Sequence, residues 1–547
     1  MTHTPPLPTE LLHLVFTFCS NPTLFSSCRV SKAWLEPALS VLWKDVPHPT
    51  VLFRLLEPWD AKVTFEATMG KFSRPLRPRD WDAFDRYASR VRSVNWNERD
   101  SDITDGAKIS RPVLAEIARI KPRFTLLPAL CKLTVNAEHM DYMTLFLHPG
   151  LKELEIKFDN HGYSRGYNGV EGVVDGLQLI PAFAPGLQVL DVHCPYSVSL
   201  FNPLFCAVLR SLTSLKNLIL PRYWLTDRVV EALGSLPHLE RFNWRYDRGG
   251  GGPVDLVGFS ATLQGQDSFS ALSHFSLELD FSVVRTFLDQ STVLERLSSL
   301  DITTINRAPP LEIHQFLQMC AERSMSLKKL SVDGFPNEPT SVGVEDIINM
   351  QILEPILSCH NLTSFTIHYP TPLHLSEDDL HLIGIKLPKL RSLLLAESPF
   401  HLHPPLLSLS ALLLVLEHYP HLEEIGLYLD GNSSFVNPAK LVKPHPTLRQ
   451  FSVGASPLLP NNVGKVSLFL SRLMSTNLNS GTLGGINYSM GYDPSYEDTL
   501  SSAELRSREE FAGAWEDVDL KLPTLVAARD EERRIYEEIL QSRRDQN

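Results

Sequence analysis

Paired cysteines are missing from this 547-residue sequence. Its seven cysteines are scattered, and none forms a Cys-x-x-Cys motif. An odd, sparse set of cysteines in a long chain is typical of reduced thiols inside a cell rather than of a disulfide framework. The sequence also has no basic-then-apolar leader, and its most apolar helical stretch, residues 406–416, is far shorter than the ~20 residues that cross a bilayer. We therefore expect a cytoplasmic or nuclear protein with no membrane partner.

An excess of positive charge is missing as well. The chain has 51 Lys and Arg residues against 63 Asp and Glu residues, which gives a formal net charge of −12. This balance disfavours non-specific binding to nucleic acid. The basic residues between Lys71 and Arg99 are interrupted by four acidic ones, so they indicate a solvated face. We expect no nucleic-acid partner.

Signatures of catalysis and of metal binding are missing too. The sequence has neither a Walker motif nor a Rossmann fingerprint. Residues 487–491 lack the first glycine of a nucleophile elbow. His401 and His403 have no further ligand at metal-binding spacing, and two prolines follow them. We expect no catalytic, cofactor-binding or metal-binding residues, and no enzyme.

Acidic residues 377–379 have another explanation. They follow Ser376, a residue type that caps helices, and acidic side chains are stabilised at the positive end of a helix dipole. The run therefore predicts a helix that begins after Ser376.

The first forty-six residues contain three short helical patterns. Thr9 is expected to cap the first helix, Asn21-Pro22 to break it, and Thr23 to start the second. A third pattern runs from about Trp34 to Trp43. A domain this small rarely buries all its apolar surface alone, so its aromatic residues suggest a face reserved for a partner.

Four elements of this segment have the order and spacing of one family: Leu7-Pro8-x-Glu10, Val15-Phe16, Val30-x-x-x-Trp34 and Leu42-Trp43. The segment resembles the F-box. The resemblance implies a docking module for the Skp-type adaptor of a cullin-RING ubiquitin ligase, with Pro8 and Leu11 nearest the contact. The residues that it divides between F-box core and adaptor contact are Leu7, Pro8, Leu11, Val15, Phe16, Leu24, Val30, Trp34, Leu42 and Trp43.

A repeated phrase, Leu-x-x-Leu-x-Leu or a close variant, follows this segment. Twelve copies recur with a mean spacing of about 29 residues, and a degenerate copy begins at Val91. The end of each phrase alternates like a strand, and amphipathic helical stretches lie between copies. The helical stretches are 208–212, 227–236, 283–294, 313–323, 347–359, 378–387 and 406–419. One strand and one helix cannot bury their apolar sides alone, so such units stack into a solenoid.

This region resembles leucine-rich repeats, although the spacings of 21 to 36 residues are loose and the usual Asn or Cys is mostly missing. The expected fold class is α/β: a three-helix F-box, a solenoid with parallel strands inside and helices outside, and a helical C-terminal tail. The polar stretch 159–176 is expected to be a loop, and Pro523 is expected to divide the tail. The expected domains are an F-box (1–46), a connecting segment with the degenerate repeat (47–125), the solenoid (126–480), a polar linker (481–501) and a charged helical tail (502–547).

Six residues on the other face of the strands are candidates for binding a target. Arg241 and Arg245 would lie on one strand and form a patch for an acidic or phosphorylated segment, because guanidinium groups bind phosphate in a forked geometry. Ordinary solvated positions are the alternative. The full candidate set is Asp191, His193, Arg241, Asn243, Arg245 and Glu278.

The two resemblances together imply a substrate-recognition subunit of a ubiquitin ligase. Its partners would be a Skp-type adaptor, through it a cullin, and a target protein that the sequence does not identify. A non-degradative F-box scaffold remains the alternative. Neither reading requires a cofactor.

Overall fold

The computed structural model describes residues 7–56, 59–63, 68–97, 108–121, 124–158, 169–245, 250–260, 268–306, 308–335, 346–433, 444–474, 486–489 and 499–545. The chain divides into two compact units, Met1–Ala271 and Leu272–Asn547. None of the described helices is long and apolar enough to cross a membrane.

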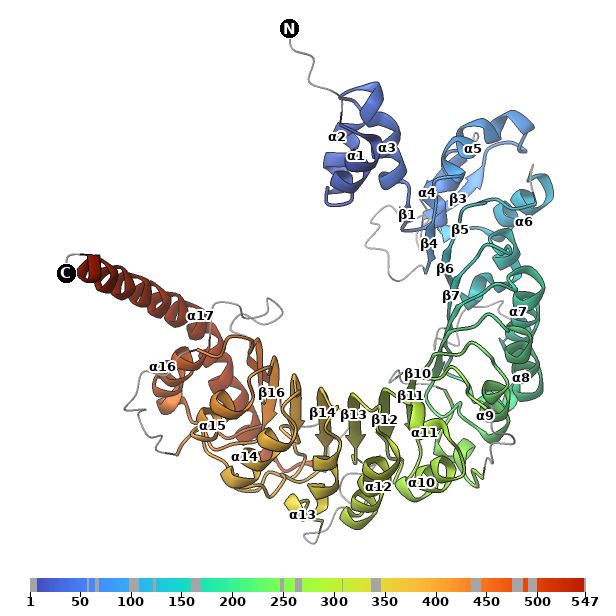
Figure 1. Ribbon diagram of the computed structural model, residues 1–547. Helices are drawn as coiled ribbons and strands as arrows, with labels where there is room; N and C mark the ends of the chain where they lie inside the picture. Colours follow the sequence, from blue (N-terminus) through green and yellow to red (C-terminus); the bar gives the residue numbers. More distant parts are fainter. Residues whose placement is uncertain are drawn as a thin grey trace. The chain divides into compact units, whose positions relative to one another are not determined.

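Three helices form a small module at the start of the first unit (Figure 1): α1 (Thr9–Phe16), α2 (Asn21–Ser27) and α3 (Lys32–Leu42). Its core consists of Leu12, Phe16, Leu24 and Ala38. The ring of Phe16 packs edge-on against Trp34 with centroids 5.5 Å apart. The predicted three helices are therefore present, around a core of very few residues.

The starts of these helices differ from the prediction. Thr9 lies inside α1, whose N-cap is Pro8, and no side chain caps the helix there. Asn21-Pro22 does not separate two helices at Thr23 but forms the first turn of α2. Proline is tolerated in a first turn because the N–H that it lacks has no intrahelical partner there. The side chain of Ser31 caps α3 by accepting a hydrogen bond from the Trp34 backbone N–H.

Parallel strands form the main sheet of the first unit. Their order is β1 (Asp45–Val46), β4 (Ser93–Trp96), β6 (Lys132–Asn136), β7 (Glu153–Lys157), β8 (Val189–His193), β9 (Asn217–Pro221) and β10 (Arg241–Arg245). The helical segments of this unit are α4 (Pro49–Phe53), η1 (Pro78–Trp81), α5 (Asp82–Ala88), α6 (Arg111–Ile120), η2 (Ala137–Leu145), α7 (Gly169–Phe183), η3 (Val198–Leu200), α8 (Asn202–Ser211), α9 (Asp227–Gly234) and η4 (Pro253–Leu256). A smaller sheet contains β2 (Trp59–Val63), β3 (Thr68–Phe72) and β5 (Lys108–Ile109).

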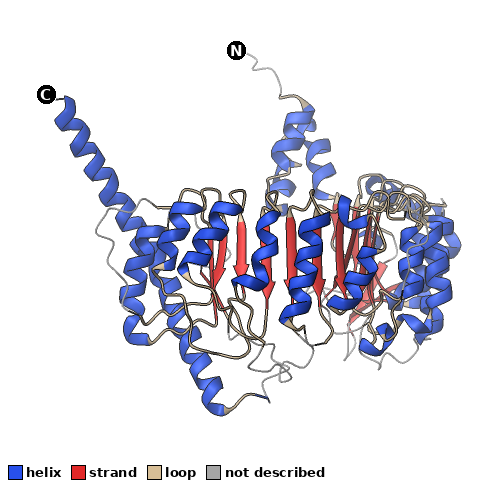
Figure 2. Ribbon diagram, turned by 60° about the horizontal axis from the view of Figure 1, so that its bottom comes forward, coloured by secondary structure: helices blue, strands red, loops and turns tan. Residues whose placement is uncertain are grey.

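The second unit repeats the same arrangement. Its strands, all parallel, are β11 (His274–Glu278), β12 (Ser299–Thr303), β13 (Lys329–Asp333), β14 (Ser364–His368), β15 (Ser392–Leu395), β16 (Glu424–Leu427), β17 (Gln450–Gly454) and β18 (Ile486–Tyr488). Its helical segments are α10 (Phe281–Asp289), α11 (Val293–Arg296), α12 (Pro310–Arg323), α13 (Met350–Leu353), η6 (Glu354–Ser358), α14 (Glu377–Lys386), α15 (Ala411–His418), η7 (Pro460–Asn462), α16 (Val463–Leu473) and α17 (Ser502–Asp545). Helices cover one face of the strands (Figure 2).

The repeated leucines form the core between strands and helices. Leu133, Leu154, Leu190 and Leu218 stand in register on β6 to β9 and are at most 1% exposed. Two equivalents in the second unit, Leu330 and Leu393, are buried to the same extent. The degenerate copy is part of the first sheet, since β4 pairs with β1 and β6. The predicted α/β fold class, with leucine-rich repeats and a helical tail, is confirmed.

Several predicted boundaries are wrong. Helix α7 already begins at Gly169, inside the stretch expected to be a loop, whose residues 159–168 lie outside the described part of the chain. The linker expected at 481–501 contains β18, because Ile486 is fully buried and pairs with Phe451. The stretch 347–359 forms only the short α13 and a 3₁₀ turn, and α15 starts at Ala411 rather than at residue 406.

Pro523 does not divide the C-terminal tail. It lies within α17, a continuous helix of 44 residues. A proline in a helix interior costs about 3 kcal/mol because it removes one hydrogen bond and crowds the preceding turn. Leu522 and Val526, on either side of it, are buried. Their packing offsets the local free-energy cost of the proline. The spacing of single residues in the sequence does not reveal such packing.

Candidate partner-binding surfaces

One face of the N-terminal module is apolar and exposed. Leu7, Leu11, Leu14, Val15 and Phe18 are between 48% and 85% exposed. Helical spacing places Leu11, Leu14, Val15 and Phe18 on one side of α1 and the turn after it, and Leu7 directly precedes this helix. Leu12 and Phe16 point into the core. We call these five residues the α1 face. Large apolar side chains that gather in this way on a surface mark a binding site for a partner.

The candidate adaptor-binding residues divide between core and surface. Phe16 and Leu24 are core residues, and Trp34 and Leu42 pack against that core while half-buried. Trp43 stacks on Tyr87, outside the module, with ring centroids 4.5 Å apart. The exposed members are Leu7, Pro8, Leu11, Val15 and Val30.

Sequence reasoning missed three exposed apolar residues, Leu14, Phe18 and Phe25. For Leu14 and Phe18 a signal was present, because they follow Leu11 by three and seven residues and so fall on the same side of a helix. The four F-box-like sequence elements do not include these positions.

The module is attached to the rest of the first unit through α3. The guanidinium of Arg90 donates to Glu36 at 2.5 Å and to Ser40 at 2.8 Å. Strand β1, directly after α3, pairs with β4. These contacts involve no residue of the α1 face, which therefore keeps its exposure while the module is fixed to the first repeat.

Charged side chains meet on the face of β7, β8 and β10 that lies opposite the leucine core. We call Glu155, Asp191, His193 and Arg245 the polar ladder. The guanidinium of Arg245 donates two hydrogen bonds to the Asp191 carboxylate, one of them at 2.9 Å from Nε to Oδ1. His193 Nε2 lies 3.0 Å from Glu155 Oε1, and Lys157 Nζ lies 3.5 Å from the same oxygen. The ladder is a connected network of opposite charges.

The network changes the acidity of Glu155. Hydrogen bonds from His193 and then from Thr134, which donates at 2.9 Å, lower the pKa of this carboxyl group from 4.5 to about 2, against the opposing effect of burial. The side-chain groups of Glu155, Asp191 and His193 lie within 4.8 Å of one another and could ligate a cation. The Arg245 guanidinium already binds Asp191. The positive charge that balances the carboxylates of this site therefore comes from an arginine of the chain itself.

The predicted target-binding arginines have different surroundings. Arg241 is exposed at the start of β10, and among the described residues it forms no ion pair, whereas Arg245 is bound to Asp191. Asn243, between them, is half-buried. Glu278 lies on β11 in the second unit and is only 3% exposed. A role of these residues in target binding stays a prediction, with Arg241 the most accessible of them.

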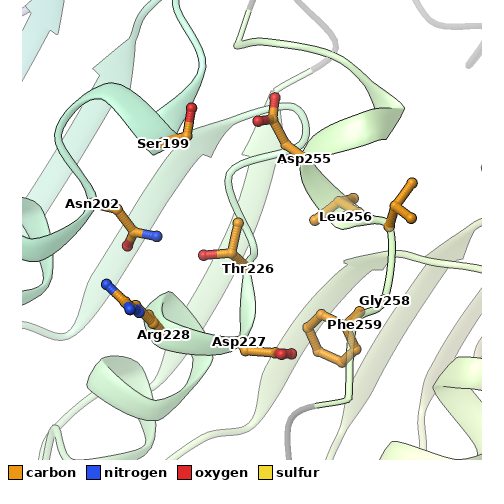
Figure 3. Close-up of a pocket in the computed structure, with 10 residues that line it drawn as sticks. Ser199, Asn202, Thr226, Asp227, Arg228, Asp255, Leu256, Gly258 and Phe259 are labelled. Carbon is orange, nitrogen blue, oxygen red and sulfur yellow. The ribbon is translucent and has the colours of Figure 1, made fainter.

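A polar cavity of about 220 Å³ lies beside the N-termini of α8 and α9 (Figure 3). One wall is the segment around η4. Asp255 fixes this segment by accepting from the Ser197 hydroxyl at 2.5 Å and from the Gly252 N–H at 3.1 Å. Asp227 accepts from the Ser260 N–H at 2.9 Å. The lining residues are Ser199, Asn202, Thr226, Asp227, Arg228, Asp255, Leu256, Val257, Gly258 and Phe259.

This cavity was not foreseen from the sequence. Gly250 and Gly251 have φ of +101° and +99°, and a Cβ at Gly250 would meet the Arg222 carbonyl oxygen. Glycine is required there for the chain to fold back. Among the described residues the lining includes no histidine or cysteine, and the carboxylates of Asp227 and Asp255 already accept hydrogen bonds from the segment around η4. It forms a polar cleft without a nucleophile–base pair.

The chain was compared with known proteins and structures. No family model and no curated protein matches it. Among solved structures, yeast Rad7 in complex with Elc1 is 12% identical, with a TM-score of 0.38 over 81% of this chain and 92% of that one. The leucine-rich-repeat protein LegL7 from Legionella pneumophila is 14% identical, with a TM-score of 0.30 over 56% of this chain and 82% of that one. At these values the comparisons leave the partners of this chain open.

Proposed function

We propose that this chain is the substrate-recognition subunit of a cullin-RING ubiquitin ligase. The N-terminal module docks a Skp-type adaptor, the repeats bind a target protein, and the chain itself catalyses nothing. The observation that carries the proposal is the α1 face: an exposed apolar surface in the segment that resembles the F-box. A module with so small a core gains stability when a partner covers such a surface.

Tethering explains how such a protein acts without catalytic residues. Binding adaptor and target on one chain turns the meeting of target lysines and a charged ubiquitin-conjugating enzyme into an effectively intramolecular event. The required parts are two binding surfaces held on one scaffold. The attachment of the module to the stacked repeats through Arg90 and β1 supports this part of the proposal.

A reducing compartment suits the cysteines of this chain. All seven are free thiols, and four of them are buried. Burial raises the pKa of Cys194 to about 12 and that of Cys359 to about 11. Such thiols are unreactive packing groups. We propose a cytoplasmic or nuclear location on this basis.

The adaptor half of the proposal is tested by co-purification. Leu7→Ala combined with Pro8→Ala, and separately Leu11→Glu combined with Val15→Glu, should abolish capture of the adaptor. All four residues are exposed, so the fold should be kept. The matched control is Val254→Glu with Val257→Glu, two exposed apolar residues elsewhere in the first unit. Adaptor capture that survives both α1-face variants would refute the F-box assignment.

The target half is tested by comparing captured proteins. Arg241→Glu reverses an exposed charge that forms no ion pair with the described residues, whereas Arg245→Glu also removes the partner of Asp191. The control is Arg228→Glu, an exposed arginine at the polar cavity. Loss of the same proteins with Arg241→Glu but not with Arg228→Glu supports target binding at the polar face of β10. An unchanged set with both Arg241→Glu and Arg245→Glu means that the target binds elsewhere.

A further inference from the structure

The C-terminal helix has a packed part and a part whose large apolar side chains are exposed. From its start to Arg529, α17 packs against α16, η7 and β18. Trp515 is fully buried and donates from Nε1 to the Ser456 carbonyl oxygen at 2.9 Å. Arg529 Nε donates to Ser471 Oγ on α16 at 2.7 Å. Beyond Arg529 the helix continues to Asp545 and runs out past α16 (Figure 1).

Apolar side chains continue along this projecting part. Ile535, Tyr536, Ile539 and Leu540 are 51%, 62%, 46% and 39% exposed. At about 100° per residue they fall on one side of the helix as two pairs, one turn apart. We call these four residues the tail stripe. Most helical stability comes from the packing of an apolar face, so a contact along this exposed stripe would stabilise the end of α17.

A charged residue stands at each end of the tail stripe. Glu532 precedes Ile535 by three residues, and Arg543 follows Leu540 by three, so both share the direction of the stripe. Both are exposed, and neither forms an ion pair with any described residue. The surface thus runs from an acid through two apolar pairs to a base. Glu537 and Glu538, in its middle, point away from it by more than a quarter turn.

We propose that the tail stripe binds the tail stripe of a second copy of this chain, in antiparallel orientation about a two-fold axis. In that orientation Glu532 of each copy meets Arg543 of the other, and the two apolar pairs face each other. A parallel pair would place Glu532 against Glu532 and Arg543 against Arg543. A two-fold contact needs a surface that is complementary to itself, and this order of charges satisfies that condition in one orientation only.

The length of the tail stripe limits the affinity of the proposed dimer. Glu532 and Arg543 are eleven residues apart, or about 16 Å along a helix. A contact of this length buries less than the roughly 800 Å² per partner of a standard protein interface. The dimer is therefore weak, with a dissociation constant on the order of micromolar. It would join two receptor chains without using the α1 face or the polar ladder, so it does not depend on the proposed function.

The experiment is sedimentation equilibrium of the full chain from about 1 to about 100 μM, a range that brackets such an affinity. Wild type should shift from monomer to dimer. Ile539→Glu should remain monomeric, and Arg543→Glu should weaken association at least tenfold, because Glu532 then faces an acid. Glu532→Arg combined with Arg543→Glu should restore dimerisation. Circular dichroism of each variant confirms that the helix is retained.

Arg534→Glu is the matched control, because Arg534 points to the opposite side of the helix. It should leave the dimer unchanged. A wild-type chain that stays monomeric at the highest concentration overturns the proposal. A dimer that persists in Ile539→Glu shows a contact elsewhere and also overturns it. Equal association of wild type and Arg543→Glu excludes the antiparallel orientation.

Discussion

The N-terminal module and the repeats use leucine in opposite ways. In the repeats, each strand leucine is covered by neighbouring strands and by the helices packed on the sheet, so that Leu190 and Leu218 have no exposed surface. In the module, Leu11 and Leu14 are about half exposed because none of the described elements covers that side of α1. The difference shows that the stacking of neighbouring repeats buries the leucine side chains. A repeat inside the array is completed by its own chain, whereas the module needs another molecule to complete it.

The largest expected effect tests the contrast between buried leucines in the repeats and exposed leucines in the module. Leu218→Ala should lower the free energy of unfolding by about 2–5 kcal/mol, since it leaves a cavity in a packed core. Leu11→Ala, the same chemical change at an exposed position, should cost less than about 0.5 kcal/mol. Urea unfolding of the full chain followed by circular dichroism gives both values. Equal losses would mean that the α1 face is not solvent-exposed in solution.

The repeats could be predicted from the sequence because their signal is local. Leu133 and Leu154 belong to phrases in which strand, register and burial all follow from one short spacing. Ile486 had no such phrase, and its burial comes from pairing with Phe451, far away in the chain. Only the three-dimensional register of the strands shows that contact.

The candidate surfaces were predicted in part for the same reason. Three of the five members of the α1 face, Leu7, Leu11 and Val15, could be named in advance because they belong to the F-box-like segment. The bond between Arg245 and Asp191 joins β10 to β8 across β9, over 54 residues of sequence. The sequence placed both residues on one face of the sheet, but it could not show that Asp191 neutralises one of the two arginines.

Acid should affect the repeats through the polar ladder. The pKa of Glu155 is lowered from 4.5 to about 2 in the folded chain, so its ionised form favours folding above the ordinary pKa. This contribution, on the order of 3 kcal/mol at neutral pH, should disappear as the pH falls from about 4.5 to about 2. Unfolding by urea at a series of pH values measures it. Glu155→Gln should remove most of this pH dependence, and an unchanged pH profile would contradict the role of the ladder.

The smallest expected effect concerns the N-terminal caps of two helices, α14 in the repeats and α1 in the module. Ser376 Oγ accepts from the Asp379 N–H at 3.2 Å, and Asp379 Oδ2 accepts from the Ser376 N–H at 2.8 Å, so α14 has the predicted cap. Ser376→Ala should therefore cost about 1 kcal/mol. Thr9→Ala should cost nothing measurable, because Thr9 lies inside α1 and caps nothing. Thermal unfolding of both variants separates the cases. A matching loss for Thr9→Ala would show that α1 in solution begins after Thr9, as its sequence suggested.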